Sequence, residues 1–335
     1  MAAPTLTTPP TLAPHPVTPR PGTVTAGILG LGAALPRRVV TNDDLAATLD
    51  TSDEWIRSRT GIGTRHVAAP HETTSTLAID AARRALDDAR VGPDELDAVL
   101  VATTTPEHRM PATAPWVAAA LGTHAAATDL HAACSGFVNG LQLAGGLIAT
   151  GASRVLLVGA EVLTRVVDQS DRTTAVLFGD GAGAVVLGAG TGELGPFDVG
   201  SDGSLRELLW IPPDDGYVRM RGREVYRHAV TRMTASARAV LDRADLAVGD
   251  LDLFVGHQAN ARILDAVISR LGLRPEQTHV TVDRHGNTSA ASIPLALADA
   301  AVTGRLRPGS RVLLTAFGAG LTWASCLLTW PEEAP

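Results

Sequence analysis

A cysteine lies among small residues in the stretch LHAACSGFVNG, residues 130–140, of a chain that has only one other cysteine. Cys134 stands where a strand-like run gives way to a pattern that predicts a helix. A thiol at a helix N-terminus experiences the partial positive charge of unpaired N–H groups, which favours the thiolate. The pattern therefore indicates a nucleophile, although an inert buried cysteine fits the same position. Cys326, in the alternating apolar stretch TWASCLLTW, is expected to be inert.

Two further polar residues fit acyl chemistry. His257 in FVGHQAN follows a short buried strand, where α/β sheets present functional groups to a crevice, but a structural hydrogen-bonding role fits it equally well. Asn287 in DRHGNTSAAS is expected either to serve a site or to cap the following helix, because asparagine is a favoured N-cap residue. His285 competes with Asn287 for a role there, and His131 is expected to serve the backbone or packing.

An internal repeat brings the cysteine, the histidine and the asparagine together. The segment 83–104 aligns with 238–258 at an offset of 155 positions, and SRVLL at 153–157 returns at 310–314. Two collinear matches predict two copies of one α/β unit related by a pseudo-twofold axis. The small-residue helices of the two copies then meet near that axis, which places the three polar residues across the junction of the halves.

The repeat divides the chain into residues 24–190 and 195–333, preceded by a Pro/Thr-rich tail, residues 1–23, that is expected to be disordered. In each half an amphipathic helix precedes a buried apolar strand, Ala98–Ala102 in the first and Leu253–Gly256 in the second. Strands and helices alternate after that. This alternation predicts mixed sheets covered by helices on both faces.

Composition excludes several classes of function. The chain has 335 residues, of which 45% are hydrophobic, and a net charge of −7, so it has no general attraction for nucleic acid or acidic membranes. Its apolar runs are too short to span a bilayer, and no CxxC or HExxH spacing is present to hold a metal. The glycine-rich FGDGAGAVVLG at 178–188 leads into a strand rather than a helix, so it is not a nucleotide-binding loop. The expected location is the cytoplasm.

Six blocks of sequence carry a family resemblance. In chain order they are TSDEWIRSRTGIGTRHVA, AACSGF, DRTTAVLFGDGAGA, GHQANARI, DRHGNTSAASIP and FGAGLTWAS, within about residues 25–330. Together they resemble β-ketoacyl-acyl-carrier-protein synthase III, a branch of the thiolase superfamily. The resemblance implies an α/β, five-layered αβαβα thiolase fold, a homodimer, and no metal or redox cofactor.

The resemblance also implies roles for individual residues. It carries a catalytic triad over to Cys134, His257 and Asn287. An oxyanion hole is implied from the backbone N–H groups of Cys134 and Ala319. The implied acyl pocket includes Phe317, Met110 and Leu321. Coenzyme A binding is implied for Trp55, Arg59, Arg172 and Asn260. Docking of the carrier protein is implied for Arg227, Arg262 and Arg270.

The implied reaction is decarboxylative condensation of an acyl-CoA starter with malonyl-acyl carrier protein through an acyl-Cys134 intermediate. Some positions depart from the family pattern, and these are Met110, Thr173, Ala319, Leu321, Ala324 and the shortened segment 205–220. Because several of them are expected near the acyl pocket, they leave the starter acyl group open. Separately, the sequence leaves open whether the product enters a fatty acid or a polyketide pathway.

Other functions compete with this one. A non-decarboxylating relative would use the same acyl-cysteine to move an acyl group from CoA or a carrier protein to a hydroxyl, amine or thiol. An inactive scaffold is the non-enzyme alternative. A thiolase needs a second catalytic cysteine near its C-terminal glycine loop, whereas Cys326 lies in a predicted strand after TW. Hydroxymethylglutaryl-CoA synthase uses a glutamate base, and no sequence block of this chain matches the one that carries it.

Overall fold

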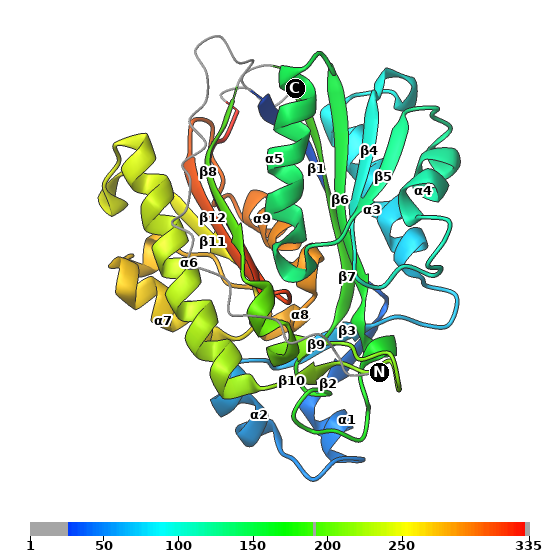
Figure 1. The fold of residues 1–335 in the computed structure, drawn as a ribbon, viewed down its shortest axis with the longest axis vertical. Helices are drawn as coiled ribbons and strands as arrows, with labels where there is room; N and C mark the ends of the chain where they lie inside the picture. Colours follow the sequence, from blue (N-terminus) through cyan, green and yellow to red (C-terminus); the bar gives the residue numbers. More distant parts are fainter. Residues whose placement is uncertain (1–25, 190–191, 332–335) are drawn as a thin grey trace, which may run out of the picture.

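Two mixed β-sheets form the framework of the computed structural model, which describes residues 26–189 and 192–331 (Figure 1). The first sheet has the order β1 (Ala26–Ala34), β7 (Asp180–Ala189), β6 (Arg154–Val162), β4 (Ala98–Ala102) and β5 (Ala126–Leu130). The second has the order β11 (Leu253–Gly256), β12 (Arg311–Gly318), β13 (Thr322–Thr329) and β8 (Glu193–Ser201). The expected tail, residues 1–23, lies outside the described residues, as do the expected limits of the halves at 24, 190 and 333.

The two sheets repeat one pattern of strand order and direction. In the first sheet β4 and β6 are parallel, and β7 pairs antiparallel with β6 and β1. In the second sheet β11 and β12 are parallel, and β13 pairs antiparallel with β12 and β8. Only β5, which lies parallel to β4, has no counterpart among the described strands. The pseudo-twofold repeat predicted from the sequence is therefore confirmed.

Helices cover both faces of both sheets and complete five layers (Figure 1). The outer helices of the first sheet are α3 (Thr74–Ala89) and α4 (Thr113–Leu121). The helices between the sheets are α5 (Gly136–Ala149) and α9 (Ser292–Val302). The outer helices of the second sheet are α6 (Gly222–Ala244) and α7 (Ala261–Leu271). This αβαβα order is the one expected for the fold class.

Burial explains why the central strands form where the sequence predicts them. All five residues of β4 and all four of β11 are buried, with the bounds expected from their apolar runs. Strands covered by helices on both faces carry continuous apolar residues rather than alternating ones. None of the helices in the described part of the chain is long and apolar enough to cross a membrane.

Short elements gather near one end of the layers, at the bottom of Figure 1. They are β2 (Arg38–Thr41), α1 (Asn42–Ala46), α2 (Asp53–Thr60), β3 (Thr64–Val67), β9 (Leu209–Trp210), β10 (Arg219–Met220) and α8 (Val282–His285). Among them, α2, β9 and β10 contribute residues to the wall of the cavity described below.

Four described non-glycine residues have left-handed backbone angles, and they form two pairs one repeat apart. Arg90 (φ 52°) and Asp245 (φ 53°) end α3 and α6. Ala133 (φ 45°) and Ser289 (φ 48°) begin short 3₁₀ turns before α5 and α9. Because non-glycine residues seldom adopt such angles, their recurrence at matching positions shows that both halves share local backbone geometry.

Candidate active site

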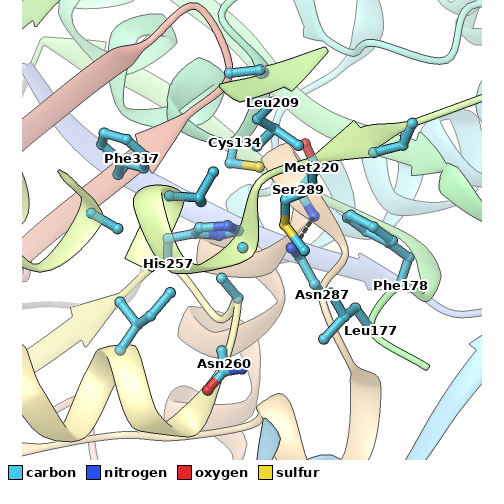
Figure 2. Close-up of a pocket in the computed structure, with 18 of the residues that line it drawn as sticks. Cys134, Leu177, Phe178, Leu209, Met220, His257, Asn260, Asn287, Ser289 and Phe317 are labelled. Carbon is cyan, nitrogen blue, oxygen red and sulfur yellow. Dashed lines mark hydrogen bonds between the residues drawn. The ribbon is translucent and has the colours of Figure 1, made fainter. Parts of the chain in front are cut away.

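A cavity of about 1020 Å³ is lined by residues from both halves of the chain. Cys134, His257 and Asn287 all contribute to its wall, and Figure 2 shows their side chains around the same space. The three residues come from the turn before α5, the end of β11 and the loop before α9. The structure thus brings together the three residues that the repeat predicted to meet.

Cys134 is placed by close packing of the two halves. It lies in the 3₁₀ turn Ala133–Ser135, and that turn packs against the end of β12 at Gly318. A Cβ atom at Gly318 would lie 2.7 Å from the backbone nitrogen of Cys134, so only glycine allows this approach. The other half repeats the arrangement, since a Cβ atom at Gly159 would lie 2.3 Å from the carbonyl oxygen of Ala290.

The Cys134 thiol is buried, and its acidity differs from the sequence-based expectation. The pKa of this thiol is raised to about 12, chiefly by burial and to a smaller extent by the negative charge of Glu161, while the Ser289 hydroxyl acts to lower it. Burial thus opposes the thiolate that a helix terminus favours. α5 itself begins at Gly136, two residues beyond the cysteine.

His257 is held in one orientation as a neutral imidazole. Its backbone N–H donates to the carbonyl oxygen of Thr315 at 2.8 Å, and its ring Nδ1 lies 2.7 Å from the hydroxyl oxygen of Ser292. Burial lowers the pKa of His257 to about 3. With Nδ1 engaged by Ser292, the other ring nitrogen, Nε2, is the one left to face a substrate.

Asn287 is fixed by its backbone and by one side-chain oxygen. Its N–H donates to the carbonyl of Leu177 at 2.8 Å, and its carbonyl accepts from the N–H of Gly179 at 3.0 Å. Its Oδ1 accepts from the N–H of Ser289 at 2.9 Å, the contact dashed in Figure 2. This contact forms a local turn and not a helix cap, because the N-cap residue of α9 is Ala291 and that cap has no side-chain hydrogen bond. The expectation that Asn287 caps the following helix is therefore wrong, and its Nδ2 group is left to donate elsewhere.

The expected acyl-pocket residues divide into two groups. Phe317 and Ala319 line the cavity. Met110 does not: it lies in the loop between β4 and α4 and is 87% exposed. Leu321 does not line the cavity either, because its side chain is buried in the apolar cluster that includes residues of α6 and α7. In this chain Met110 and Leu321 are thus placed outside the cavity in which they were expected.

Aromatic and cationic groups surround the entrance. Trp55 and Arg59 of α2 line the cavity, and Asn260 at the start of α7 donates to the carbonyl of Arg59 at 3.1 Å. Arg172 does not line the cavity, but its guanidinium carbon lies 5.2 Å from the Trp55 ring centroid. Arg172 also donates to the carbonyl oxygen of Asp50. The half-buried Trp55 ring is therefore flanked by cations rather than enclosed in the core.

The three expected docking arginines lie on α6 and α7, which pack together. Arg262 lines the cavity and lies 5.9 Å from the centroid of the Tyr226 ring. Arg227 and Arg270 are exposed and lie outside the cavity wall. All three belong to the outer helical layer of the second sheet, and only Arg262 reaches the cavity wall.

Several residues of the wall were not assigned from the sequence. Polar ones are Thr104, Arg206, Arg223 and Ser289, and apolar ones include Leu177, Phe178, Leu209, Trp210 and Met220. Apolar residues of the segment 205–220 form part of this wall. Their clustering in the sequence was the signal that could have identified them. No group of residues suited to hold a metal ion occurs within residues 26–189 and 192–331.

Three other residues considered in the sequence, His131, His285 and Cys326, lie at different distances from the catalytic part of the cavity wall. His131, expected to serve the backbone or packing, is exposed and lines the cavity rather than lying in the core. His285, the competitor of Asn287, lies outside the wall with its ring centroid 5.5 Å from that of His66. Cys326 is fully buried in β13 opposite Leu314, as expected for an inert residue.

The family models and the most similar curated proteins all name the same family. Residues 128–203 match the family model of 3-oxoacyl-[acyl-carrier-protein] synthase III, and residues 241–330 match the model of its C-terminal part. Beta-ketoacyl-[acyl-carrier-protein] synthase III 3 of Streptomyces coelicolor is 52% identical over 92% of this chain and 98% of its own length. The corresponding protein of Acidiphilium cryptum is 51% identical over 89% of this chain and 97% of its own.

Solved structures agree. Synthase III from Pseudomonas aeruginosa superposes with a TM-score of 0.89 at 49% identity, covering 93% of this chain and all of that one. The priming β-ketosynthase of the R1128 polyketide pathway has a TM-score of 0.89 at 37% identity, covering 96% of this chain and all of that one. With the cavity, the fold and these relatives in agreement, the chain belongs to the 3-oxoacyl-[acyl-carrier-protein] synthase III family of thiolase-fold enzymes.

Proposed function

We propose that this enzyme condenses an acyl-CoA starter with malonyl-acyl carrier protein, releases carbon dioxide and gives a β-ketoacyl-carrier protein that initiates fatty acid or polyketide synthesis. The observation that carries the proposal is the convergence of Cys134, His257 and Asn287 on one cavity in a member of this family. A thiol, a neutral imidazole and an amide suit acyl transfer followed by stabilisation of an enolate.

The first half-reaction is acylation. The Cys134 sulfur attacks the thioester carbonyl, and the negative oxygen that forms is held by the backbone N–H groups of Cys134 and Ala319, two residues of the cavity wall. Coenzyme A leaves and an acyl-Cys134 remains. Because burial raises the pKa of the thiol to about 12, the attack requires a group that takes the thiol proton.

The second half-reaction is condensation. Nε2 of His257 and Nδ2 of Asn287 donate hydrogen bonds to the thioester carbonyl of the malonyl group, where negative charge develops as carbon dioxide leaves. The enolate then attacks the acyl-Cys134 carbonyl. Phe317, which is almost fully buried beside the cavity, keeps water from competing with the enolate.

Two surfaces receive the substrates in this proposal. Trp55, Arg59 and Arg172 hold the nucleotide end of coenzyme A, with the adenine against the half-buried indole and the phosphates beside the guanidinium groups. Asn260 lies along the channel for the pantetheine arm. The acidic carrier protein docks on the arginines of α6 and α7, because local positive charge guides an acidic partner to a chain of negative net charge.

The proposal includes a cytoplasmic homodimer that needs no metal or redox cofactor. The loss of carbon dioxide supplies the carbanion, so the carbon–carbon bond forms without oxidation or reduction. Hydrogen bonds from His257 and Asn287 provide the charge stabilisation that a metal ion provides in other enzymes.

The test follows both half-reactions in one assay. Wild-type protein is mixed with acyl-CoA and labelled malonyl carrier protein, and we expect an acyl adduct on Cys134 by mass spectrometry together with released labelled carbon dioxide. Cys134→Ala should abolish the acyl adduct and the β-ketoacyl product, while the matched control Cys326→Ala should retain both because that thiol lies in the core. A wild-type adduct without any carbon dioxide release would replace this proposal with simple acyl transfer.

A further inference from the structure

The two N–H groups proposed to hold the oxyanion come from different halves of the chain. Cys134 lies in the 3₁₀ turn before α5, and Ala319 lies in the tight turn between β12 and β13. Within residues 26–189 and 192–331 neither N–H donates to a backbone carbonyl, so both are available to a substrate oxygen. Two such donors stabilise one oxyanion only if both lie about 2.7–3.1 Å from it. The relative placement of the two turns therefore decides whether the donors can act together.

Thr322, the first residue of β13, contacts both turns through its hydroxyl. The hydroxyl oxygen lies 3.0 Å from the carbonyl oxygen of Ala319 and 3.2 Å from that of Ala132. It also lies 2.9 Å from the hydroxyl oxygen of Ser135. Ala132 and Ser135 stand on either side of the Ala133–Cys134 pair in the first half, whereas Ala319 belongs to the second. A single hydroxyl in the cavity wall thus joins the two sources of oxyanion donors.

The hydroxyl protons can be assigned as one continuous chain. Nδ2 of Asn139, on α5, donates to the hydroxyl oxygen of Ser135 at 3.0 Å. The carbonyl of Ala132 already accepts from the N–H of Ser135 at 3.2 Å, which leaves the Ser135 hydroxyl to donate to Thr322. The Thr322 hydroxyl then donates to the carbonyl of Ala319. Each hydroxyl accepts once and donates once, and hydrogen bonds in such a chain strengthen one another.

The far side of the hairpin turn is held by the backbone. The N–H of Leu321 donates to the carbonyl of Asp202 at 2.9 Å, and the carbonyl of Leu321 accepts from the N–H of Asp202 at 2.7 Å. The Leu321 side chain is buried in the apolar cluster that includes residues of α6 and α7. With that end of the turn fixed to its own half, the Thr322 hydroxyl fixes Ala319 relative to the other half.

We propose that the hydroxyls of Thr322 and Ser135 position the oxyanion hole by holding the N–H groups of Ala319 and Cys134 at a fixed spacing. Neither hydroxyl touches the reacting carbonyl in this role, so both belong to positioning residues. The inference rests on the proposed function, in which these N–H groups bind the oxyanion. A misplacement of about 1 Å can cost about 10²-fold in rate. Complete loss of one donor costs about 10²- to 10³-fold, which sets the upper limit of the effect.

Two reactions of the same thiol test this role. Acylation by acyl-CoA places negative charge on a carbonyl oxygen, whereas alkylation by iodoacetamide displaces iodide from a carbon atom and needs no oxyanion hole. Both reactions of Cys134 are followed by mass spectrometry under single-turnover conditions. Thr322→Val should slow acylation by about 10- to 10²-fold and leave the alkylation rate within about twofold of wild type. Thr322→Ser keeps the hydroxyl and should restore most of the acylation rate.

Two serine variants complete the comparison. Ser325→Ala is the matched control, because Ser325 is as fully buried as Ser135 and its hydroxyl donates to that of Thr315 at 2.7 Å, within one half. It should acylate and alkylate at the wild-type rates. Ser135→Ala should slow acylation by less than Thr322→Val does, because the contact between Thr322 and Ala319 remains. The double variant should be no slower than Thr322→Val, because both substitutions interrupt the same chain.

Equal slowing of acylation and alkylation in Thr322→Val would refute the positioning role, because the hydroxyl would then act on the thiol or on the whole fold. Acylation by that variant within about twofold of wild type would refute it as well. Urea titration shows whether Thr322→Val is folded. If it is not, Ser135→Ala decides the matter, since slower acylation with unchanged alkylation supports the role and unchanged acylation refutes it. Failure of the wild-type protein to form acyl-Cys134, with alkylation intact, would instead overturn the proposed function.

Discussion

Replacing His257 with glutamine should separate the two half-reactions. The variant keeps a neutral polar side chain but loses the ring donor aimed at the malonyl carbonyl. Removing one such donor typically slows the step it serves by about 10²- to 10³-fold. We therefore expect carbon dioxide release from preformed acyl-enzyme to fall by that factor in His257→Gln, while acyl-Cys134 formation stays near the wild-type rate. Asn287→Ala should show the same separation.

The pH dependence of the effect follows from the burial of His257. With a pKa of about 3, the ring is about 99% neutral at pH 5, whereas a histidine with the ordinary value near 6.5 would be only about 3% neutral. The ratio of wild-type to His257→Gln carbon dioxide release should thus stay constant from pH 8 to pH 5. The ratio is measured with labelled malonyl carrier protein, so other titrating groups cancel. A change of about 30-fold in this ratio, centred near pH 6.5, would refute the conclusion that His257 is a buried, neutral donor.

Two further outcomes test the substrate surfaces and the buried histidines. Trp55→Ala should raise the KM for acyl-CoA and leave the KM for malonyl carrier protein unchanged. Arg227→Glu should raise the KM for malonyl carrier protein and leave the KM for acyl-CoA unchanged. Steady-state kinetics with each substrate varied in turn would reveal any overlap of the two surfaces. His285, whose pKa is lowered to about 4 chiefly by burial, binds a proton more readily in the unfolded chain. Stability should therefore fall below about pH 6.5 by up to about 1.4 kcal/mol per pH unit, and urea titrations of His285→Gln should show a smaller loss between pH 7 and pH 5.

The parts predictable from sequence were those encoded by local pattern and repetition. Continuous apolar runs located β4 and β11, because strands buried on both faces leave little choice of residue. The internal repeat predicted two equivalent sheets, and with them the meeting of Cys134, His257 and Asn287. That meeting depends on topology alone, so no knowledge of side-chain packing was needed.

The parts that could not be predicted depend on packing in three dimensions. The acidity of Cys134 is set by how completely neighbouring groups exclude water, which a favourable position beside a helix does not reveal. Met110 and Leu321 were assigned from family position, but the directions of their side chains are decided by a loop and by the core.

The backbone explains why one repeated turn can serve two different purposes. Ala133 and Ser289 occupy equivalent strained positions, and each turn packs against a glycine of the opposite half's central strand, Gly318 and Gly159 respectively. Strain of this kind costs about 1–3 kcal/mol at each residue and persists only where surrounding contacts hold it. In the first half the turn places the thiol at the cavity. In the second half the left-handed residue is Ser289, which lines the same cavity and whose backbone N–H donates to Asn287. Duplication of one turn therefore places Cys134 from the first half and Ser289 from the second half in the wall of one cavity.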